Sequence, residues 1–205
     1  MLELLTGSGL AAAAGMNAYI PLLAVGVANR FLPQLMQLPE GWAWLSNEWV
    51  LGIVAVLLVV EVVADKIPAV DTVNDVLQTV VRPTAGGLVF GSSSTASTMA
   101  VTDPAAFFAS NQWVPIVVGA VIALVVHGTK MAVRPIANVA TGGTAAPVIS
   151  TFEDVGAVGM TVLAIVMPVL VVVGILVLVA IVVAIVRRGR RGPGIPLDRA
   201  DGAAA

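Results

Sequence analysis

Six acidic and four basic side chains, together with the only histidine, lie beside long apolar runs in two separate stretches of the chain. They are Glu61, Asp65, Lys66, Asp71, Asp75 and Arg82 in the first stretch, and His127, Lys130, Arg134, Glu153 and Asp154 in the second. A charge at the centre of a bilayer costs roughly 2.5 kcal/mol or more. Such groups persist where they face a protein interior or an aqueous cavity, and there they mark a pathway or a site. The pattern therefore predicts a polar centre inside a membrane protein.

The two stretches supply opposite charges that can pair if the fold brings them together. The acids outnumber the bases, so two arrangements are open. In one, every charge joins a structural ion-pair lattice. In the other, one or two carboxylates remain to bind a cation or a proton, and His127 titrates near neutral pH. Such a site needs no cofactor, and its expected partner is a small ion or polar solute.

The first stretch also contains an acidic cluster that permits metal chemistry. Asp71, Asn74 and Asp75 have a spacing similar to that of the clusters that hold Mg²⁺ against a diphosphate in membrane prenyltransferases. Magnesium usually takes one or two carboxylates plus phosphate oxygens, so Asp71 and Asp75 would be its ligands. Glu153 and Asp154 form a poor second cluster for such an enzyme. The chain has no cysteine, which excludes thiolate metal sites and cysteine nucleophiles.

The composition of the chain is that of a polytopic helical membrane protein. Of 205 residues, 59% are hydrophobic and 11% are charged, and the mean hydropathy is +1.01, whereas soluble domains are about 25% charged. At about 20 residues per span, the chain has room for five or six spans in the lipid bilayer. The preference for arginine over lysine, with abundant alanine, valine and glycine, is typical of a GC-rich bacterial genome and indicates a bacterial inner-membrane protein.

The first apolar run predicts a helix that is interrupted near its middle. A span over about residues 4–28 carries Gly7, Ala11 and Gly15 at the four-residue spacing that lets helices approach closely. Asn17 and Pro21 interrupt it, and a broken helix at membrane depth requires that its freed backbone groups meet protein or cavity water. Asn17 would therefore either line the polar centre or make a hydrogen bond between helices.

The charged stretch over residues 61–83 follows a second span, which begins near Trp49. Pro68 is expected to end a helix, Asp71 to cap a new one, and Pro83 to stop it. This short helix is amphipathic, because its polar face carries Asp71, Asn74, Asp75 and Gln78. It is too short to span a bilayer, so it would lie at the interface or re-enter the membrane with its polar face towards a cavity.

The second half of the chain repeats the outline of the first. A span of small residues covers about 84–101, and a fourth span begins at Trp113. We therefore predict a single transmembrane domain over residues 1–186, with degenerate two-helix pseudo-repeats at about 4–83 and 84–154. Internal repeats with broken helices are common in secondary transporters. Ser150 and Glu153 have capping-box spacing before the last apolar run.

The last apolar run, residues 155–186, is too long for one upright span. It would form either a single tilted helix or a hairpin around Met167 and Pro168. Counting basic residues favours the hairpin and six spans, because the charged stretches and the C-terminal arginines then all lie on the cytoplasmic side. Residues 187–205 would form a basic, disordered cytoplasmic tail that flanks the membrane and does not bind nucleic acid.

Several of these motifs together resemble a bacterial membrane family. They are Gly15–Leu22 (GMNAYIPL), Glu61–Pro68 (EVVADKIP), Asp71–Asp75, Arg82-Pro83, His127-x-x-Lys130-x-x-x-Arg134 and Ser150-x-x-Glu153-Asp154. On these motifs the chain resembles the domain-of-unknown-function 4126 family over about residues 5–170. The resemblance implies that these positions share one site, and it implies no established activity. The arginine tail after Val186 lies outside the pattern.

The sequence thus predicts an all-α membrane transporter or channel for a small ion or polar solute. Glu61, Asp65 and Asp71 would be the cation or proton ligands. The counter-charges, or contacts for an anionic group, would be Lys66, Arg82, Lys130 and Arg134. The alternatives are a Mg²⁺-dependent membrane enzyme acting on a lipid phosphate or diphosphate and, third, a non-transporting assembly protein. The small-residue helix faces are also compatible with a homo-oligomer.

Overall fold

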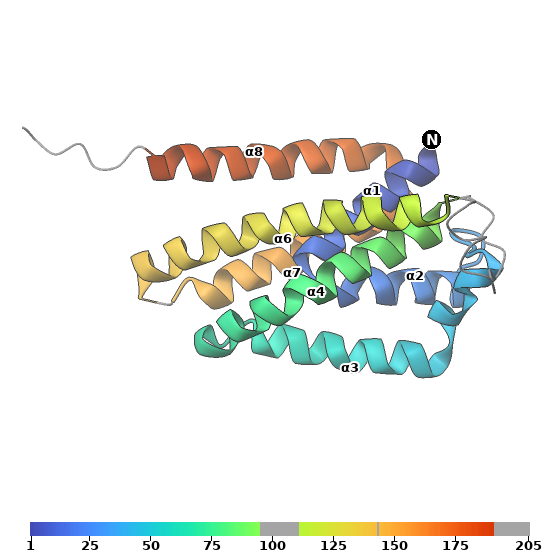
Figure 1. The fold of residues 1–205 in the computed structure, drawn as a ribbon, viewed down its shortest axis with the longest axis horizontal. Coiled ribbons are helices and arrows are strands. Elements are labelled where there is room, and N and C mark those ends of the chain that lie inside the picture. The colour runs from blue at the N-terminus through green and yellow to red at the C-terminus, as the bar shows by residue number, and fades with distance from the viewer. Residues whose placement is uncertain (95–110, 143, 191–205) are drawn as a thin grey trace, which may run out of the picture.

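The computed structural model consists of helices that run roughly along one long axis (Figure 1). It describes residues 1–94, 111–142 and 144–190, and within these ranges it contains no strand, which confirms the predicted all-α class. The helices are α1 (Leu2–Met16), α2 (Tyr19–Phe31), α3 (Glu48–Ala64), α4 (Pro68–Ser93), α6 (Trp113–Thr141), α7 (Ala146–Val166) and α8 (Val171–Arg190), with 3₁₀ segments η1 (Glu40–Ser46) and η2 (Pro168–Leu170).

The first apolar run forms a hairpin of two short helices instead of the single span predicted over residues 4–28. Figure 1 shows α1 running in from the N-terminus and α2 running back towards the same end. Asn17 makes the break, because its Oδ1 accepts hydrogen bonds from the backbone N–H groups of Tyr19, at 3.1 Å, and Ile20, at 3.2 Å. This cap satisfies two amides that the start of α2 would otherwise leave unpaired. The predicted interruption is confirmed, and the single span is wrong.

α4 is one continuous helix where the sequence predicted two elements. It begins at Pro68, in the first turn, where a proline is tolerated. Asp71 therefore lies inside the helix and does not cap it, and α4 also passes through Pro83. An interior proline costs roughly 3 kcal/mol in an isolated helix, but α4 packs extensively against α1 and α6. Thr84 also bonds back to the Val80 carbonyl, at 2.7 Å. The predicted pseudo-repeat boundary, between residues 83 and 84, thus falls within α4, and the repeat stays a prediction.

The last apolar run reverses direction at the predicted hairpin. α7 ends before Met167, whose backbone is not helical, and α8 begins after the short η2 segment. Figure 1 shows α8 running back along the bundle. α8 continues to Arg190, so residues 187–190 of the predicted disordered tail are helical, and residues 191–205 lie outside the described part of the chain.

The predicted capping box before α7 is wrong. The helix begins at Ala146 with Pro147 in its first turn, so Ser150 lies one turn inside it and is fully buried. Proline is well suited to this first turn because its missing N–H would have no helical partner there. The position of Pro147 therefore agrees with the observed start of α7, whereas the spacing of Ser150 and Glu153 does not.

Two helical segments of the described chain are long and apolar enough to cross a membrane. They are Trp113–Arg134, within α6, and Ala146–Val166, which is α7. η1 and α3 meet at a bend of 56°, and they provide a third candidate span if the two are counted as one. α1, α2 and Pro168–Ile181 are apolar but shorter. These helices indicate a membrane protein, while the number of five or six spans stays a prediction.

Small residues allow α1 to pass through the middle of the bundle. Leu10, Ala11, Ala13 and Ala14 are all fully buried, and α1 packs against α4, α6 and α7. A Cβ atom on Gly15 would lie 2.6 Å from the Ala123 carbonyl oxygen of α6. The small-residue spacing in the first run therefore serves close helix packing, as it commonly does in lipid.

The contact between α4 and α6 gives a stability prediction with a control on the same helix. A Cβ on Gly119 would lie 2.3 Å from the Gly86 carbonyl oxygen, whereas one on Gly128 would meet nothing within 4 Å. We expect Gly119→Val to destabilise the protein by about 1–3 kcal/mol through overpacking, and Gly128→Val to have a much smaller effect. Thermal unfolding in detergent measures both. Equal shifts would contradict the close approach of α4 and α6.

Candidate functional site

The two charged stretches meet in one buried cluster formed by α3, α4, α6 and α7, which the tip of the α1–α2 hairpin touches. The buried polar side chains of this cluster are Asn17, Glu61, Asp65, Asp75, Gln78, Arg82, His127, Lys130 and Arg134. Helical spacing explains how they gather, because residues at i, i+3 and i+7 share one helix face. This spacing is found in Asp75, Gln78 and Arg82 on α4, and in His127, Lys130 and Arg134 on α6. Each helix therefore turns a single polar face inwards.

Arg82 occupies the deepest part of the cluster, and its side chain is 0% exposed. Its Nη2 donates to Glu61 Oε1, at 2.8 Å, and lies 3.6 Å from Asp65 Oδ2. Its Nη1 donates to the Gly15 carbonyl oxygen, at 3.3 Å, close to the end of α1. The guanidinium thus neutralises a carboxylate of α3 and also satisfies a backbone carbonyl beside the helix break.

His127 is held as a neutral ring between Arg82 and Thr79. Its Nδ1 lies 3.3 Å from Arg82 Nη1, and since a guanidinium can only donate, Nδ1 must accept. Nε2 then carries the proton and donates to Thr79 Oγ1, at 3.2 Å. The Thr79 hydroxyl in turn donates to the Asp75 carbonyl oxygen, at 3.0 Å. The histidine joins α6 to α4 in this arrangement.

Lys130 and Arg134 link three helices through shared carboxylates. Lys130 Nζ lies 3.1 Å from Asp65 Oδ2, 3.1 Å from Glu153 Oε2 and 3.7 Å from Asp75 Oδ1. Arg134 contacts the same three acids, with Nη2 bonded to Glu153 and lying 3.5 Å from Asp65 Oδ2. Asp65 directly follows α3, Asp75 lies in α4 and Glu153 lies in α7, so the two cations hold all three helices against α6.

The four remaining predicted residues, of which Asn17 is buried, complete the cluster. Asn17 Nδ2 donates to Asp154 Oδ1, at 3.0 Å, which ties the hairpin tip to α7. Lys66, whose side chain is 38% exposed, lies 3.5 Å from the other oxygen of Asp154. Asn74 Nδ2 donates to Asp65 Oδ1, at 2.7 Å. Asn17 therefore both caps α2 and makes the interhelical hydrogen bond that was one of its two predicted roles.

Several polar atoms of this cluster are buried and make no hydrogen bond to the described residues. They include three acceptor oxygens, Glu61 Oε2, Asp75 Oδ1 and Gln78 Oε1, and one donor, Arg82 Nε. A buried acceptor without a partner costs about 1–3 kcal/mol, so proteins rarely keep one without a reason. The cluster is thus nearly, but not completely, the ion-pair lattice that the sequence left open as one of its two arrangements.

The whole cluster lies within the range that a family model matches. That model is described as Domain of unknown function (DUF4126), and it matches residues 4–188. The chain belongs to the DUF4126 family. The resemblance read from the sequence motifs is therefore confirmed, and the matched range extends beyond residue 170 into α8. Neither a search of curated proteins nor a search of solved structures found a match to this DUF4126 member.

The structure gathers every predicted site residue of this DUF4126 member except Asp71, whose side chain lies outside the described part of the chain. The predicted metal ligands Asp71 and Asp75 therefore remain a prediction. Among the described residues, no group of three or more histidine, aspartate or glutamate side chains could hold a metal ion. Asp75 instead faces Lys130, at 3.7 Å, and Arg134, at 3.7 Å.

Sequence reasoning missed two members of the cluster. Thr79 lies one helical turn after Asp75 on α4, so the same spacing argument that grouped the charges could have included it. The Gly15 carbonyl oxygen, which receives Arg82, could not have been found in this way. A backbone acceptor carries no sequence signal, and only the three-dimensional placement of the break beside α4 reveals it.

Proposed function

We propose that this DUF4126 member is a bacterial inner-membrane transporter or channel in which a small ion or polar solute passes the buried cluster. The observation that carries the proposal is Glu61 Oε2, an acceptor that is buried and makes no hydrogen bond to the described residues. Its sister atom, Oε1, is already paired with Arg82. A carboxylate oxygen in that position suits a cation, a proton or a hydrogen-bond donor in transit.

The α1–α2 hairpin supports a permeation role. Each of its helices is apolar and too short to cross a membrane alone, so the hairpin would re-enter the bilayer from one side. Discontinuous helices at membrane depth are tolerated where the broken backbone lines a cavity or is buried in protein, and they build the substrate sites of many transporters. Here the tip residue, Asn17, contacts Asp154 at the cluster.

The distribution of basic residues supports one orientation for such a bundle. Figure 1 places the α3–α4 connection, the α6–α7 connection and the C-terminal end of α8 at one end of the bundle, and the N-terminus and the end of α2 at the other. Lys66 and Arg187 belong to the first end, and Arg30, at the end of α2, belongs to the second. By the positive-inside rule the first end is cytoplasmic. Five spans (α3, α4, α6, α7 and α8) and one re-entrant hairpin then replace the six spans favoured by the sequence.

The conformation described here would be a closed one. The Glu61 side chain is 0% exposed, so the aqueous cavity reaching Glu61 that open transport requires is not present in it. Passage of a solute requires that Glu61 and Arg82 separate, and the incoming ion would replace the lost partner of the carboxylate. The ion-pair lattice then acts as the gate of the pathway.

A non-transporting assembly protein is the second candidate. The contact of Lys130 with three carboxylates favours it, because such pairing can serve to fix helix positions alone. No group among the described residues favours the metal-dependent enzyme. Flux through the purified protein separates the transport proposal from the assembly proposal.

Glu61→Gln is expected to abolish flux, because it removes the charge at the gate while keeping the size of the side chain. Uptake of radiolabelled rubidium, methylammonium and glycerol into proteoliposomes is the measurement. Glu48→Gln is the matched control, since Glu48 begins the same helix and its side chain is 71% exposed. Uptake of all three tracers no faster than into empty liposomes, or uptake that Glu61→Gln leaves intact, would overturn the proposal.

A further inference from the structure

The charged cluster carries more acid than base among its described side chains. Lys66 and Asp154 pair with each other. The other charged side chains are four carboxylates and three cations, namely Glu61, Asp65, Asp75, Glu153, Arg82, Lys130 and Arg134. Because His127 is neutral, one negative charge is left over. Burying a net charge is costly, and one bound proton would make this described set neutral.

Glu61 is the carboxylate that can take this proton without losing a hydrogen bond. Its Oε1 accepts from Arg82, at 2.8 Å, but its Oε2 makes no hydrogen bond to the described residues. Asp65, by contrast, accepts from Asn74 at Oδ1, and from Lys130 at Oδ2. A proton on Asp65 would displace one of these donors, whereas Glu61 Oε2 is available.

The two other acids are already held between cations. Asp75 Oδ1 lies 3.7 Å from Lys130 Nζ, and Asp75 Oδ2 lies 3.7 Å from Arg134 Nη1. Glu153 Oε2 contacts the same two cations. A proton on either acid would therefore weaken two ion pairs, whereas a proton on Glu61 weakens its pair with Arg82.

Gln78 provides a buried acceptor that has no donor. It is 3% exposed and lies on α4 one turn before Arg82, so the two side chains are neighbours on the helix surface. The Gln78 side chain hydrogen-bonds Tyr19, on which the charge of Glu61 also acts. Since Gln78 Oε1 makes no hydrogen bond to the described residues, this bond uses Nε2. Gln78 Oε1 can therefore accept from a protonated Glu61 in the same part of the cluster.

Arg82 has a second acid within reach when Glu61 becomes neutral. Its Nη2 lies 3.6 Å from Asp65 Oδ2. A hydrogen bond to an ionised group is roughly twice as strong as one between neutral groups, so a neutral Glu61 holds the guanidinium less firmly. Protonation of Glu61 thus favours the movement of Arg82 towards Asp65, which separates the pair at the gate and leaves no buried charge without a partner.

His127 is a poorer proton site than Glu61. Its Nδ1 accepts from Arg82, at 3.3 Å, and its Nε2 already carries a proton. Protonation of Nδ1 would break the bond to Arg82 and set two positive charges face to face. The titratable and charged groups around Glu61 are Tyr19 of α2, Asp65 after α3, Arg82 of α4, and His127 and Lys130 of α6.

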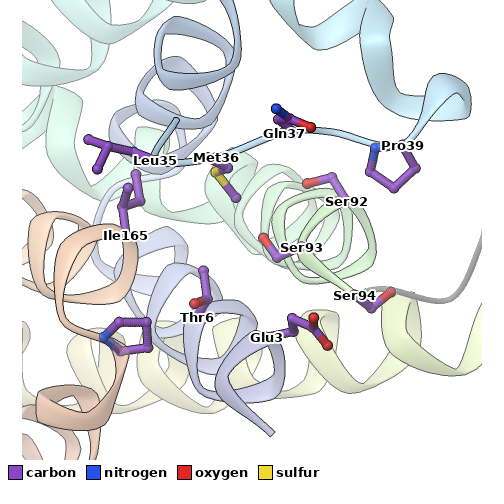
Figure 2. A pocket seen from close by; sticks show the side chains of 11 residues that line it. Glu3, Thr6, Leu35, Met36, Gln37, Pro39, Ser92, Ser93, Ser94 and Ile165 are labelled. Carbon is purple, nitrogen blue, oxygen red and sulfur yellow. The ribbon is translucent and has the colours of Figure 1, made fainter. Parts of the chain in front are cut away.

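The exposed members of the cluster mark the side from which the proton arrives. The side chains of Lys66 and Asp154 are 38% and 18% exposed, whereas that of Glu61 is 0% exposed. Lys66 belongs to the end of the bundle that the proposed orientation makes cytoplasmic. A pocket lies at the opposite end of α4, beside Ser93 and Ser94 (Figure 2), and no member of the cluster lines it.

We propose that Glu61 binds one proton at Oε2 and releases it again in each transport cycle. In the loaded state the new O–H donates to Gln78 Oε1, and Arg82 turns to Asp65. In the unloaded state Glu61 is ionised and bonded to Arg82, as described above. The proton comes from water on the cytoplasmic side and returns to water, so no other covalent bond changes. The inference rests on the proposed function for the cycle, and it names the proton as the coupled ion.

Infrared spectroscopy of the full-length protein in dodecyl maltoside, a detergent without carbonyl groups, tests proton binding without flux. We expect acidification from about pH 8 to about pH 5.5, where exposed carboxylates stay largely ionised, to produce the C=O band of a protonated carboxyl. The band should be missing in Glu61→Gln and retained in Asp75→Asn and in the exposed control Glu48→Gln. Absence of the band from the wild type, its persistence in Glu61→Gln, or its loss in Asp75→Asn would overturn the proposal.

Gln78→Leu tests the partner of the bound proton. The midpoint of the band should fall by about one pH unit, a roughly tenfold weaker binding of the proton, because the protonated form loses one hydrogen bond. Gln34→Leu is the matched control, since Gln34 is exposed, and it should leave the midpoint unchanged. A midpoint that rises in Gln78→Leu would show that Gln78 donates to the ionised carboxylate. A rise, or no change, would contradict the proposed loaded state.

Proton movement separates this inference from the proposed function. Glu61→Gln fixes the neutral form of the side chain and should stop the cycle. A pH-sensitive dye enclosed in proteoliposomes should therefore record proton movement during tracer uptake with the wild type and none with Glu61→Gln. Tracer uptake without proton movement would overturn the proton inference alone. A Glu61 band in a protein that takes up no tracer would uphold the proton site and overturn the transport proposal.

Discussion

Arg82→Met is expected to destabilise the folded protein by about 3–5 kcal/mol, because it leaves Glu61 as a buried charge without its partner. Both side chains are 0% exposed, and Arg82 Nη2 lies 2.8 Å from Glu61 Oε1. The substitution also removes the donor to the Gly15 carbonyl oxygen beside the helix break. Thermal unfolding of the purified protein in detergent, followed by circular dichroism, measures the loss.

The double variant Glu61→Met, Arg82→Met is the matched control for this prediction. Replacing both partners of a buried ion pair with apolar side chains of similar size is often neutral or stabilising. We therefore expect the double variant to recover most of the stability that Arg82→Met loses. Asp65 keeps Lys130 as a partner, at 3.1 Å, in both variants. A double variant as unstable as the single one would contradict the assignment of the loss to Glu61.

Lys130→Met is expected to have the second large effect, a loss of about 3–5 kcal/mol of stability. Lys130 Nζ lies within 3.7 Å of carboxylates from Asp65, Asp75 and Glu153. Its removal leaves these three acids with Arg134, and with Arg82 at 3.6 Å from Asp65 only. Like charges held close together in a buried site repel strongly. Thermal unfolding in the same detergent provides the measurement.

Lys66→Met is the control for the Lys130 variant. Lys66 is the other lysine of the chain, its side chain is 38% exposed, and it lies 3.5 Å from Asp154. Exposed ion pairs of this kind contribute about 0–1 kcal/mol, so the variant should unfold close to the wild type. If Lys130→Met and Lys66→Met lose similar amounts of stability, the buried ion pairs contribute no more to stability than an exposed pair, and the prediction is wrong.

Helical spacing explains why so much of the cluster could be predicted. The period of an α-helix places Asp75 and Arg82 on one face of α4, and Lys130 and Arg134 on one face of α6, whatever the rest of the fold does. The cost of burying charge then requires that such faces meet. The break at Asn17 was also predictable from local sequence. An asparagine side chain competes for nearby backbone hydrogen bonds, and Pro21 follows four residues later, so a continuous helix is disfavoured there.

Other features could not be predicted because they depend on packing between distant segments. Pro83 is a stop signal in isolation, but close contact of α4 with α1 and α6 outweighs the cost of one missing hydrogen bond. The reversal of the chain between α1 and α2 depends on how both helices pack and not on the Asn17 motif alone. The Gly15 carbonyl that binds Arg82 likewise has no signature in the sequence.

Flux through the double variant Glu61→Met, Arg82→Met tests the central claim most directly, because the variant is expected to fold while lacking both charges at the gate. Uptake of rubidium, methylammonium and glycerol into proteoliposomes is compared with the wild type at equal amounts of folded protein. The account predicts wild-type uptake of at least one tracer and its loss in the double variant. A stable double variant that takes up the tracer as fast as the wild type would show that this buried pair only holds helices together.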